Sequence, residues 1–145
     1  MLVRHAEKTS SAPDAELSPE GIARAKRIAT MLSRSDVTRL VATDVKRTQQ
    51  TLAPLAEQLG RPVEVRPARD VDALVEELRA SADGAVVVVA HHSNGLPRIV
   101  RGLGATLPGV TPDAEAIDDG DYSRVLVVSL GCDRSRGSLV QLSSD

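Results

Sequence analysis

Apolar and polar positions along this chain predict strands that alternate with helices. The strongest strand signal is Ala85–Ala90, which is apolar throughout and rich in β-branched residues, as expected of a strand covered on both faces. Val63–Val65 alternates in polarity and is expected near a sheet edge. Further strands are expected at Met1–Val3, Thr38–Ala42, Val125–Leu130 and Ser138–Leu142, the last two as an antiparallel hairpin.

Helical spacing of apolar residues fills the intervals between these strands. Ser18, Asp44 and Asp70 each precede such a stretch, where they are expected to act as N-caps. Pro54 falls inside the second stretch and is expected to kink or divide that helix. Arg24 is interpreted as part of the solvated face of the first helix. The four stretches cover residues 19–32, 45–59, 71–78 and 96–103.

This alternation of strands and helices predicts the fold class. Strands separated by helices favour a parallel sheet with helices on both faces. The expected fold is therefore an α/β three-layer α/β/α sandwich, with a mostly parallel central sheet and an antiparallel edge near the C-terminus. A chain of 145 residues suits one domain with one core, so a single domain over residues 1–145 is predicted.

Composition narrows the class of function. The net charge of -2 gives no basic surface for nucleic acid, and an aromatic content of 1% leaves almost no platform for stacking bases. No apolar run approaches the length of a membrane span, so no membrane partner is expected. The only cysteine, Cys132, excludes an intrachain disulfide. A cytoplasmic location is expected, because His5 and Glu7 follow the apolar start at once. Oligomeric state is left open.

All three histidines lie just past the end of a predicted strand. His5 follows the first strand, and His91 and His92 follow the strand ending at Ala90. In parallel sheets, ligands bind beyond the carboxyl ends of the strands. A histidine buried only for packing is the alternative for any one of them, but two strand ends carrying all the histidines favour a functional site.

Arg4 indicates a functional site more strongly than the histidines do, because a buried guanidinium requires an anionic partner. That partner is either a salt bridge to Asp44 or Glu7, or an anionic ligand. Arg47 lies in the first turns of a helix, where the helix N-terminus also favours anions. Together with His92, these arginines predict a phosphate site.

The chemistry of such a site follows from the residue types. A neutral imidazole at His5 can attack phosphorus and form a phosphohistidine that water later hydrolyses. Arg4, Arg47 and His92 can neutralise the phosphoryl oxygens as charge spreads in the transition state. An acid is also required to protonate the leaving oxygen.

Four segments resemble the histidine phosphatase superfamily, the phosphoglycerate mutase-like group. Arg4–Glu7 resembles its Arg-His-Gly-Glu signature, and Leu17–Gly21 its Leu-Thr/Ser-x-x-Gly helix start. Thr43–Thr51 is similar to its Ser-x-x-x-Arg-Thr-x-Gln-Thr segment, and Val88–Asn94 to its Val-Val-Gly-His-Ser-Asn segment. The segments occur in the family's order and together are highly specific.

The resemblance implies a metal-independent phosphatase of the small branch that needs no cofactor. By position it implies His5 as the nucleophile and Arg4, Arg47 and His92 as the phosphate pocket. Ala6 and His91 stand where the family usually has glycine. His91 is expected to face away from the phosphate, because adjacent strand residues point oppositely.

The residue that acts as the general acid of this site is left open. In the family's larger branch it lies in the loop after the third strand, which makes Asp70 the candidate and Asp72 the reserve. Glu7, two residues from His5, is a second possibility. The alternative for Asp70 is a plain helix cap.

The leading hypothesis is a phosphomonoesterase that hydrolyses a phosphorylated small molecule. Alternatives are a protein phosphohistidine phosphatase, whose imidazole leaving group reduces the need for an acid, and a non-catalytic phosphate-binding module. A metal site formed by the three histidines is disfavoured, because adjacent histidines are poorly arranged to bind one ion. Specificity is expected in the loops Lys8–Glu16, Arg66–Asp72 and Thr106–Asp121.

Overall fold

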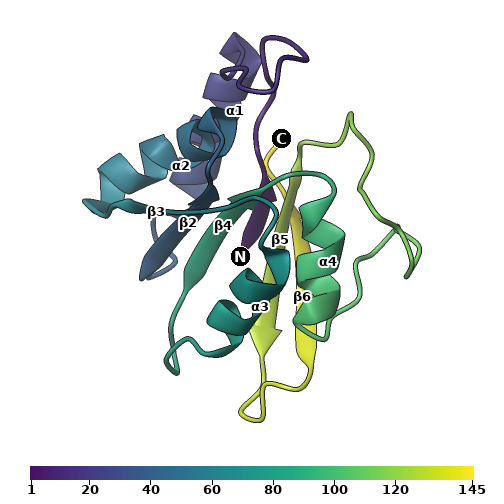
Figure 1. The fold of residues 1–145 in the computed structure, drawn as a ribbon. Coiled ribbons are helices and arrows are strands. Elements are labelled where there is room, and N and C mark those ends of the chain that lie inside the picture. The colour runs from purple at the N-terminus through teal and green to yellow at the C-terminus, as the bar shows by residue number, and fades with distance from the viewer.

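Six strands and four helices form three layers in the computed structural model, which describes residues 1–145 (Figure 1). The elements are β1 (Leu2–Arg4), α1 (Pro19–Leu32), β2 (Arg39–Thr43), α2 (Lys46–Leu59), β3 (Val63–Arg66), α3 (Val71–Arg79), β4 (Val87–His91), α4 (Gly95–Gly102), β5 (Arg124–Leu130) and β6 (Gly137–Ser143).

The strands form one sheet in the order β3-β2-β4-β1-β5-β6. The first four strands in this order are mutually parallel, whereas β5 is antiparallel to β1 and β6 is antiparallel to β5. The predicted fold class is confirmed, including the antiparallel edge and the edge position of β3. In the register of β1 and β4, Arg4 lies beside His91.

Alternate strand residues supply the two cores, because successive side chains on a strand point to opposite faces. On one face, Leu2, Val41 and Val89 pack with buried residues of α3 and α4. On the other, Val3 and Val88 pack with buried residues of α1 and α2. Both cores are aliphatic, and they hold the carboxyl ends of β1, β2 and β4 at one edge. No helix combines the length and apolar character that crossing a membrane requires.

The second helix differs in detail from the sequence prediction. Val45, not Asp44, is the N-cap of α2, and its side chain makes no capping hydrogen bond. The Asp44 carboxylate instead accepts a hydrogen bond of 2.9 Å from the Ala68 N–H, because the loop after β3 offers a donor beside it. Pro54 lies inside α2 without dividing it, and Gly60 closes the helix in a left-handed conformation.

The first helix is pressed against the chain that leaves β1. Ser18 caps α1 by accepting from the Gly21 N–H at 3.2 Å, as predicted. A Cβ atom at Gly21 would lie 2.1 Å from the Glu7 carbonyl oxygen. Glycine at this position therefore lets α1 approach the segment that carries His5, and the Glu7 carbonyl also accepts from the Ser18 N–H.

Candidate active site

Side chains from four parts of the chain meet at the carboxyl ends of β1, β2 and β4. The imidazole rings of His5 and His92 lie 5.4 Å apart, centroid to centroid. Arg47 Nη2 lies 3.2 Å from Nδ1 of His92. The Arg4 guanidinium lies over the ring of Tyr122, which in turn is 6.0 Å from the His5 ring. The structure thus brings together the four residues proposed from sequence as the nucleophile and the phosphate pocket.

His5 is held in one tautomer. Its ring nitrogen Nδ1 lies 2.9 Å from the Ala6 carbonyl oxygen, which can only accept, so Nδ1 carries the hydrogen. Nε2 is therefore left with its lone pair. Burial lowers the pKa of His5 to about 4, and the charges of Arg47 and Arg4 act in the same direction. At neutral pH, His5 is an uncharged imidazole with a nucleophilic Nε2.

The backbone around His5 fixes its place. The His5 N–H donates to the His91 carbonyl at 2.9 Å, which continues the β1–β4 pairing past the end of β1. The next N–H, that of Ala6, donates to Thr51 Oγ1 at 2.9 Å. Ala6 is fully buried. His5 is thus held to β4 on one side, and its neighbour Ala6 to α2 on the other.

Both ring nitrogens of His92 are engaged. Nδ1 accepts from Arg47 Nη2, so Nε2 carries the hydrogen and donates to Thr43 Oγ1 at 3.0 Å. Thr43 Oγ1 is 2.8 Å from Thr48 Oγ1, which donates to the Val45 carbonyl at 2.7 Å. Burial lowers the pKa of His92 to about 3, and Arg47 adds to this effect. His92 is therefore neutral and oriented by a chain of hydroxyl groups.

The two arginines each keep a buried nitrogen without a partner. Nε of Arg4 and Nε of Arg47 are the only buried side-chain nitrogen or oxygen atoms that make no hydrogen bond. A buried donor left unpaired costs free energy comparable to a lost hydrogen bond, and more when it is charged. Two guanidinium groups with unpaired N–H donors near the neutral imidazoles of His5 and His92 make this site electropositive, a property that favours an anion.

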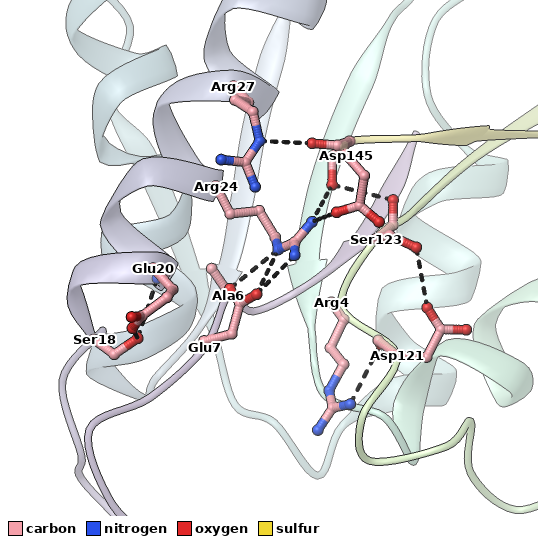
Figure 2. Close-up of polar contacts among 12 residues, drawn as sticks. Arg4, Ala6, Glu7, Ser18, Glu20, Arg24, Arg27, Asp121, Ser123 and Asp145 are labelled. Atoms are coloured by element: carbon pink, nitrogen blue, oxygen red, sulfur yellow. Dashed lines mark hydrogen bonds and ion pairs between the residues drawn. The ribbon is translucent and has the colours of Figure 1, made fainter.

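The remaining donors of Arg4 are directed to the loop before β5. Nη1 donates to the carbonyl oxygens of Asp118 and Asp119 at 3.0 and 2.8 Å, and more distantly to that of Asp121. Nη2 lies 3.2 Å from the Asp119 carboxylate. Figure 2 shows the Arg4 guanidinium beside Asp121. The alternative considered from sequence, a salt bridge from Arg4 to Asp44 or Glu7, does not form, because the folded loop places the carbonyl oxygens of Asp118 and Asp119 beside the guanidinium.

Glu7 is directed away from His5 and towards α1. Arg24 Nε lies 2.8 and 3.0 Å from the two carboxylate oxygens of Glu7, and Nη2 lies 2.7 Å from one of them (Figure 2). Burial opposes ionisation of Glu7, but the hydrogen bonds from Arg24 hold its pKa below the ordinary value. Glu7 therefore stays ionised near neutral pH, a state that disfavours it as a proton donor.

Arg24 itself was interpreted from sequence as a solvated residue, and this was wrong. Its side chain is only 11% exposed. A further nitrogen of Arg24, Nη1, contacts Ser144 Oγ at 3.0 Å. Nη1 also contacts the Asp145 carboxylate at 2.6 Å (Figure 2). Ser144 in turn donates its N–H to the Ser123 carbonyl at 2.8 Å. Arg24 thus connects the segment after His5 to the end of β6 and to the chain beside Tyr122.

The other two carboxylates considered as the acid lie on or next to α3. Asp70 occupies the N-cap position but makes no side-chain capping hydrogen bond, and it pairs with Arg69 at 3.5 Å. Asp72 forms an exposed ion pair with Arg98. Neither makes a hydrogen bond or ion pair with His5 or His92. The role of Asp70 as general acid stays a prediction.

Sequence reasoning missed three side chains of this site: Tyr122, Asp119 and Thr43. Tyr122 is the only aromatic residue of the chain, and that rarity was the available signal. Asp119 lies in the loop from which specificity was expected. Thr43 precedes α2 and holds His92. No set of three His, Cys, Asp or Glu side chains is arranged to hold a metal ion.

Comparison with known proteins gives a family match over the first part of the chain. Residues 1–70 match the histidine phosphatase superfamily (branch 1). The match contains His5, Arg4 and Arg47, and it ends at Asp70. The histidine phosphatase resemblance inferred from the four sequence segments is thereby confirmed. No curated protein is similar enough in sequence to this chain to count as a match.

Solved histidine phosphatase structures share the whole fold. The protein histidine phosphatase SixA, complexed with tungstate, superposes with a TM-score of 0.77 at 23% identity, covering 99% of this chain and 95% of that chain. A putative alpha-ribazole-5'-P phosphatase from Escherichia coli gives 0.73 at 16% identity, covering 98% and 94%. A mycobacterial glucosyl-3-phosphoglycerate phosphatase gives 0.71 at 18% identity, covering 98% and 95%. These similarities establish the histidine phosphatase fold.

Proposed function

We propose that this protein is a phosphatase that hydrolyses phosphomonoesters through a phosphohistidine intermediate on His5. The observation that carries the proposal is the pair of unpartnered buried Nε groups on Arg4 and Arg47, in the same site as a neutral His5. The family match over residues 1–70 supports the same reaction. Two of the solved structures with this fold are a glucosyl-3-phosphoglycerate phosphatase and a putative alpha-ribazole-5'-P phosphatase, which supports a small phosphorylated molecule as the substrate.

The reaction has two steps. Nε2 of His5 attacks phosphorus, the bond from phosphorus to the leaving oxygen breaks, and that oxygen takes a proton from an acid or from water. Water then attacks the phosphohistidine, the phosphorus–nitrogen bond breaks, and inorganic phosphate leaves while the Nε2 lone pair is restored. The Arg4 and Arg47 guanidinium groups neutralise the oxygens in both steps, and His92 holds Arg47 in place.

We propose that this reaction needs no metal ion, because two guanidinium groups supply the charge neutralisation that a metal gives elsewhere. Activity is therefore expected to be unchanged after exhaustive treatment with a chelator. Loss of activity on chelation, with recovery on adding a divalent cation, would contradict this part of the proposal.

The deciding experiment measures hydrolysis of a generic aryl phosphate and traps the intermediate. The His5→Ala variant should lose turnover, and wild-type protein stopped in alkali should carry a phosphoryl group that is released by acid. Circular dichroism of the variant controls for folding. Retained turnover in His5→Ala, or the absence of an acid-labile phosphoenzyme, would sink the proposal.

A protein phosphohistidine phosphatase is the second candidate. It is favoured by the three candidate acids, each of which is paired with an arginine: Glu7 with Arg24, Asp70 with Arg69 and Asp72 with Arg98. An imidazole leaving group depends less on an acid than an alkoxide does. If this candidate is correct, a phosphohistidine peptide should be hydrolysed faster than sugar phosphates, and Asp70→Asn should leave its rate unchanged. Tight vanadate binding without any turnover would instead support a non-catalytic phosphate-binding module.

A further inference from the structure

The loop before β5 places a fixed negative charge at the edge of the anion pocket. Asp119 Oδ1 lies 3.2 Å from Arg4 Nη2 and 3.3 Å from Ser93 Oγ. The Asp119 side chain is nonetheless 92% exposed. This carboxylate therefore contacts the arginine of the pocket with one oxygen, while most of it faces solvent at the edge of the site.

The loop is anchored at both ends, which keeps Asp119 in place. Ile117 is buried in the core on the α3 and α4 face, and its N–H donates to the Ser93 carbonyl at 3.1 Å. At the other end, Ser123 accepts from Ser144. Between them, the Asp118 carboxylate accepts from the Gly120 N–H at 2.8 Å and shapes the turn.

Charge compensation at this edge changes when a phosphoryl group binds. The only cation in contact with Asp119 is Arg4, and Arg4 is also a predicted ligand of the phosphate. Asp121, by contrast, has its own partner in Arg124. Once a phosphate dianion shares Arg4, the charge of Asp119 is no longer compensated by that arginine. The edge of the occupied site then repels a second negative charge on the leaving group.

We propose that Asp119 selects substrates by the charge of the leaving group: the site takes phosphomonoesters and phosphoramidates whose leaving group is neutral or cationic, and rejects those with a further anionic group. This inference rests on the proposed phosphatase function and deepens it. Phosphorylated carboxylic acids and bisphosphates fall in the rejected class. Neutral alcohols, neutral imidazoles and amine-bearing leaving groups fall in the accepted class.

The test uses three aryl phosphates that differ in one distant charge: 4-(aminomethyl)phenyl, 4-methylphenyl and 4-(carboxymethyl)phenyl phosphate. The methylene group insulates the ring, so the intrinsic reactivities stay similar. At low ionic strength, kcat/KM should fall from the cationic to the anionic compound by about tenfold, because each substrate charge interacts with an Asp119 carboxylate that is well solvated. Added salt should reduce the difference.

The variant Asp119→Asn should reduce the difference in kcat/KM between the cationic and anionic compounds to about twofold. The remaining difference comes from more distant charges. Asp36→Asn is the matched control, because Asp36 is exposed, lies in the α1–β2 connection, and has a left-handed backbone (φ 49°) that asparagine adopts readily. This control should keep the wild-type range. A wild-type enzyme that handles the three compounds equally, or an Asp119→Asn variant with the full range, overturns the inference.

A binding measurement separates this inference from the proposed function. The affinities of the His5→Ala variant for the three compounds should follow the same order, measured by isothermal titration. Ordered affinities with no turnover in the wild type would overturn the phosphatase proposal and retain charge selection. Turnover with equal affinities and equal kcat/KM for the three compounds would overturn charge selection and retain the phosphatase proposal.

Discussion

The His91 imidazole occupies the space that a side chain at Gly95 would need, since a Cβ atom at Gly95 would lie 2.0 Å from Nδ1 of His91. His91 is buried, and its Nδ1 accepts from the His92 N–H at 2.9 Å. The bulk that a histidine adds at the end of β4 is accommodated because the first residue of α4 has no side chain. The same hydrogen bond sets the turn that presents His92.

The variant Gly95→Ala is therefore expected to destabilise the protein by about 1–3 kcal/mol, the usual cost of overpacking a buried site. The double variant His91→Ala with Gly95→Ala should recover part of this loss, because the clash is gone. Urea unfolding of the four proteins in the cycle measures the coupling between the two positions. Additive effects of the two substitutions on the free energy of unfolding would contradict a direct contact between positions 91 and 95.

Activity should persist to unusually low pH for a histidine nucleophile. Burial places the pKa of His5 at about 4, so the reactive neutral form dominates above that value. We expect kcat/KM, corrected for ionisation of the substrate, to stay level from pH 7 to about 5 and to fall below it. A decline centred near the ordinary histidine pKa of about 6.5 would contradict the burial of His5.

Stability should decrease as the pH falls from 7 to 5. Burial lowers the pKa values of His5, His91 and His92 to about 4, 4 and 3. Between about 6.5 and 4 the unfolded chain binds more protons than the folded one, so the free energy of unfolding falls with pH. Urea midpoints at several pH values measure the slope. The variant His91→Gln removes one of the three groups and should show a shallower slope, and an unchanged slope would exclude His91 from this effect.

Removing Arg24 should destabilise the protein, because it leaves the Glu7 carboxylate without its partner and releases Ser144 and Asp145. We expect Arg24→Ala to lower the free energy of unfolding by about 2 kcal/mol, typical for hydrogen bonds to a charged group. Lys26→Ala, at an exposed position of the same helix, is the control and should cost little. Equal effects of the two changes would mean that the Arg24 contacts contribute nothing beyond helix propensity.

Arg47→Lys should weaken anion binding although the charge is kept. The Arg47 guanidinium uses two separate nitrogens, Nη1 for the Pro13 carbonyl and Nη2 for His92 Nδ1, and keeps Nε unpaired. A lysine has a single nitrogen, which cannot occupy these three positions together. The inhibition constant for vanadate is expected to rise by about tenfold or more. Lys46→Ala, which removes the adjacent exposed lysine paired with Asp14, should change it little. A lysine variant with wild-type vanadate affinity would show that only the charge matters.

Much of the secondary structure and layer arrangement of this protein could be predicted from short stretches of sequence. Hydrophobic periodicity located each strand and helix to within about two residues, and it indicated the layers because buried strands and amphipathic helices leave clear patterns. Ser18 was identified as a helix N-cap because its role depends on the adjacent backbone alone. Asp44 and Arg24 were misread because their partners, Ala68 and Glu7, lie in segments distant in sequence.

The amino-acid sequence by itself determined the fold class, the family resemblance and the placement of Arg4, His5, Arg47 and His92 at strand or helix ends. These features depend on short-range patterns and on the rule that parallel strands end at one edge. The tertiary structure alone decided which tautomer His5 adopts, which nitrogens of Arg4 and Arg47 stay unpartnered, and that Asp119 and Tyr122 join the site. The contacts of Arg4 with Asp119 and Tyr122 depend on how a long loop returns across the sheet, because residues more than 100 positions apart meet only when the core is packed.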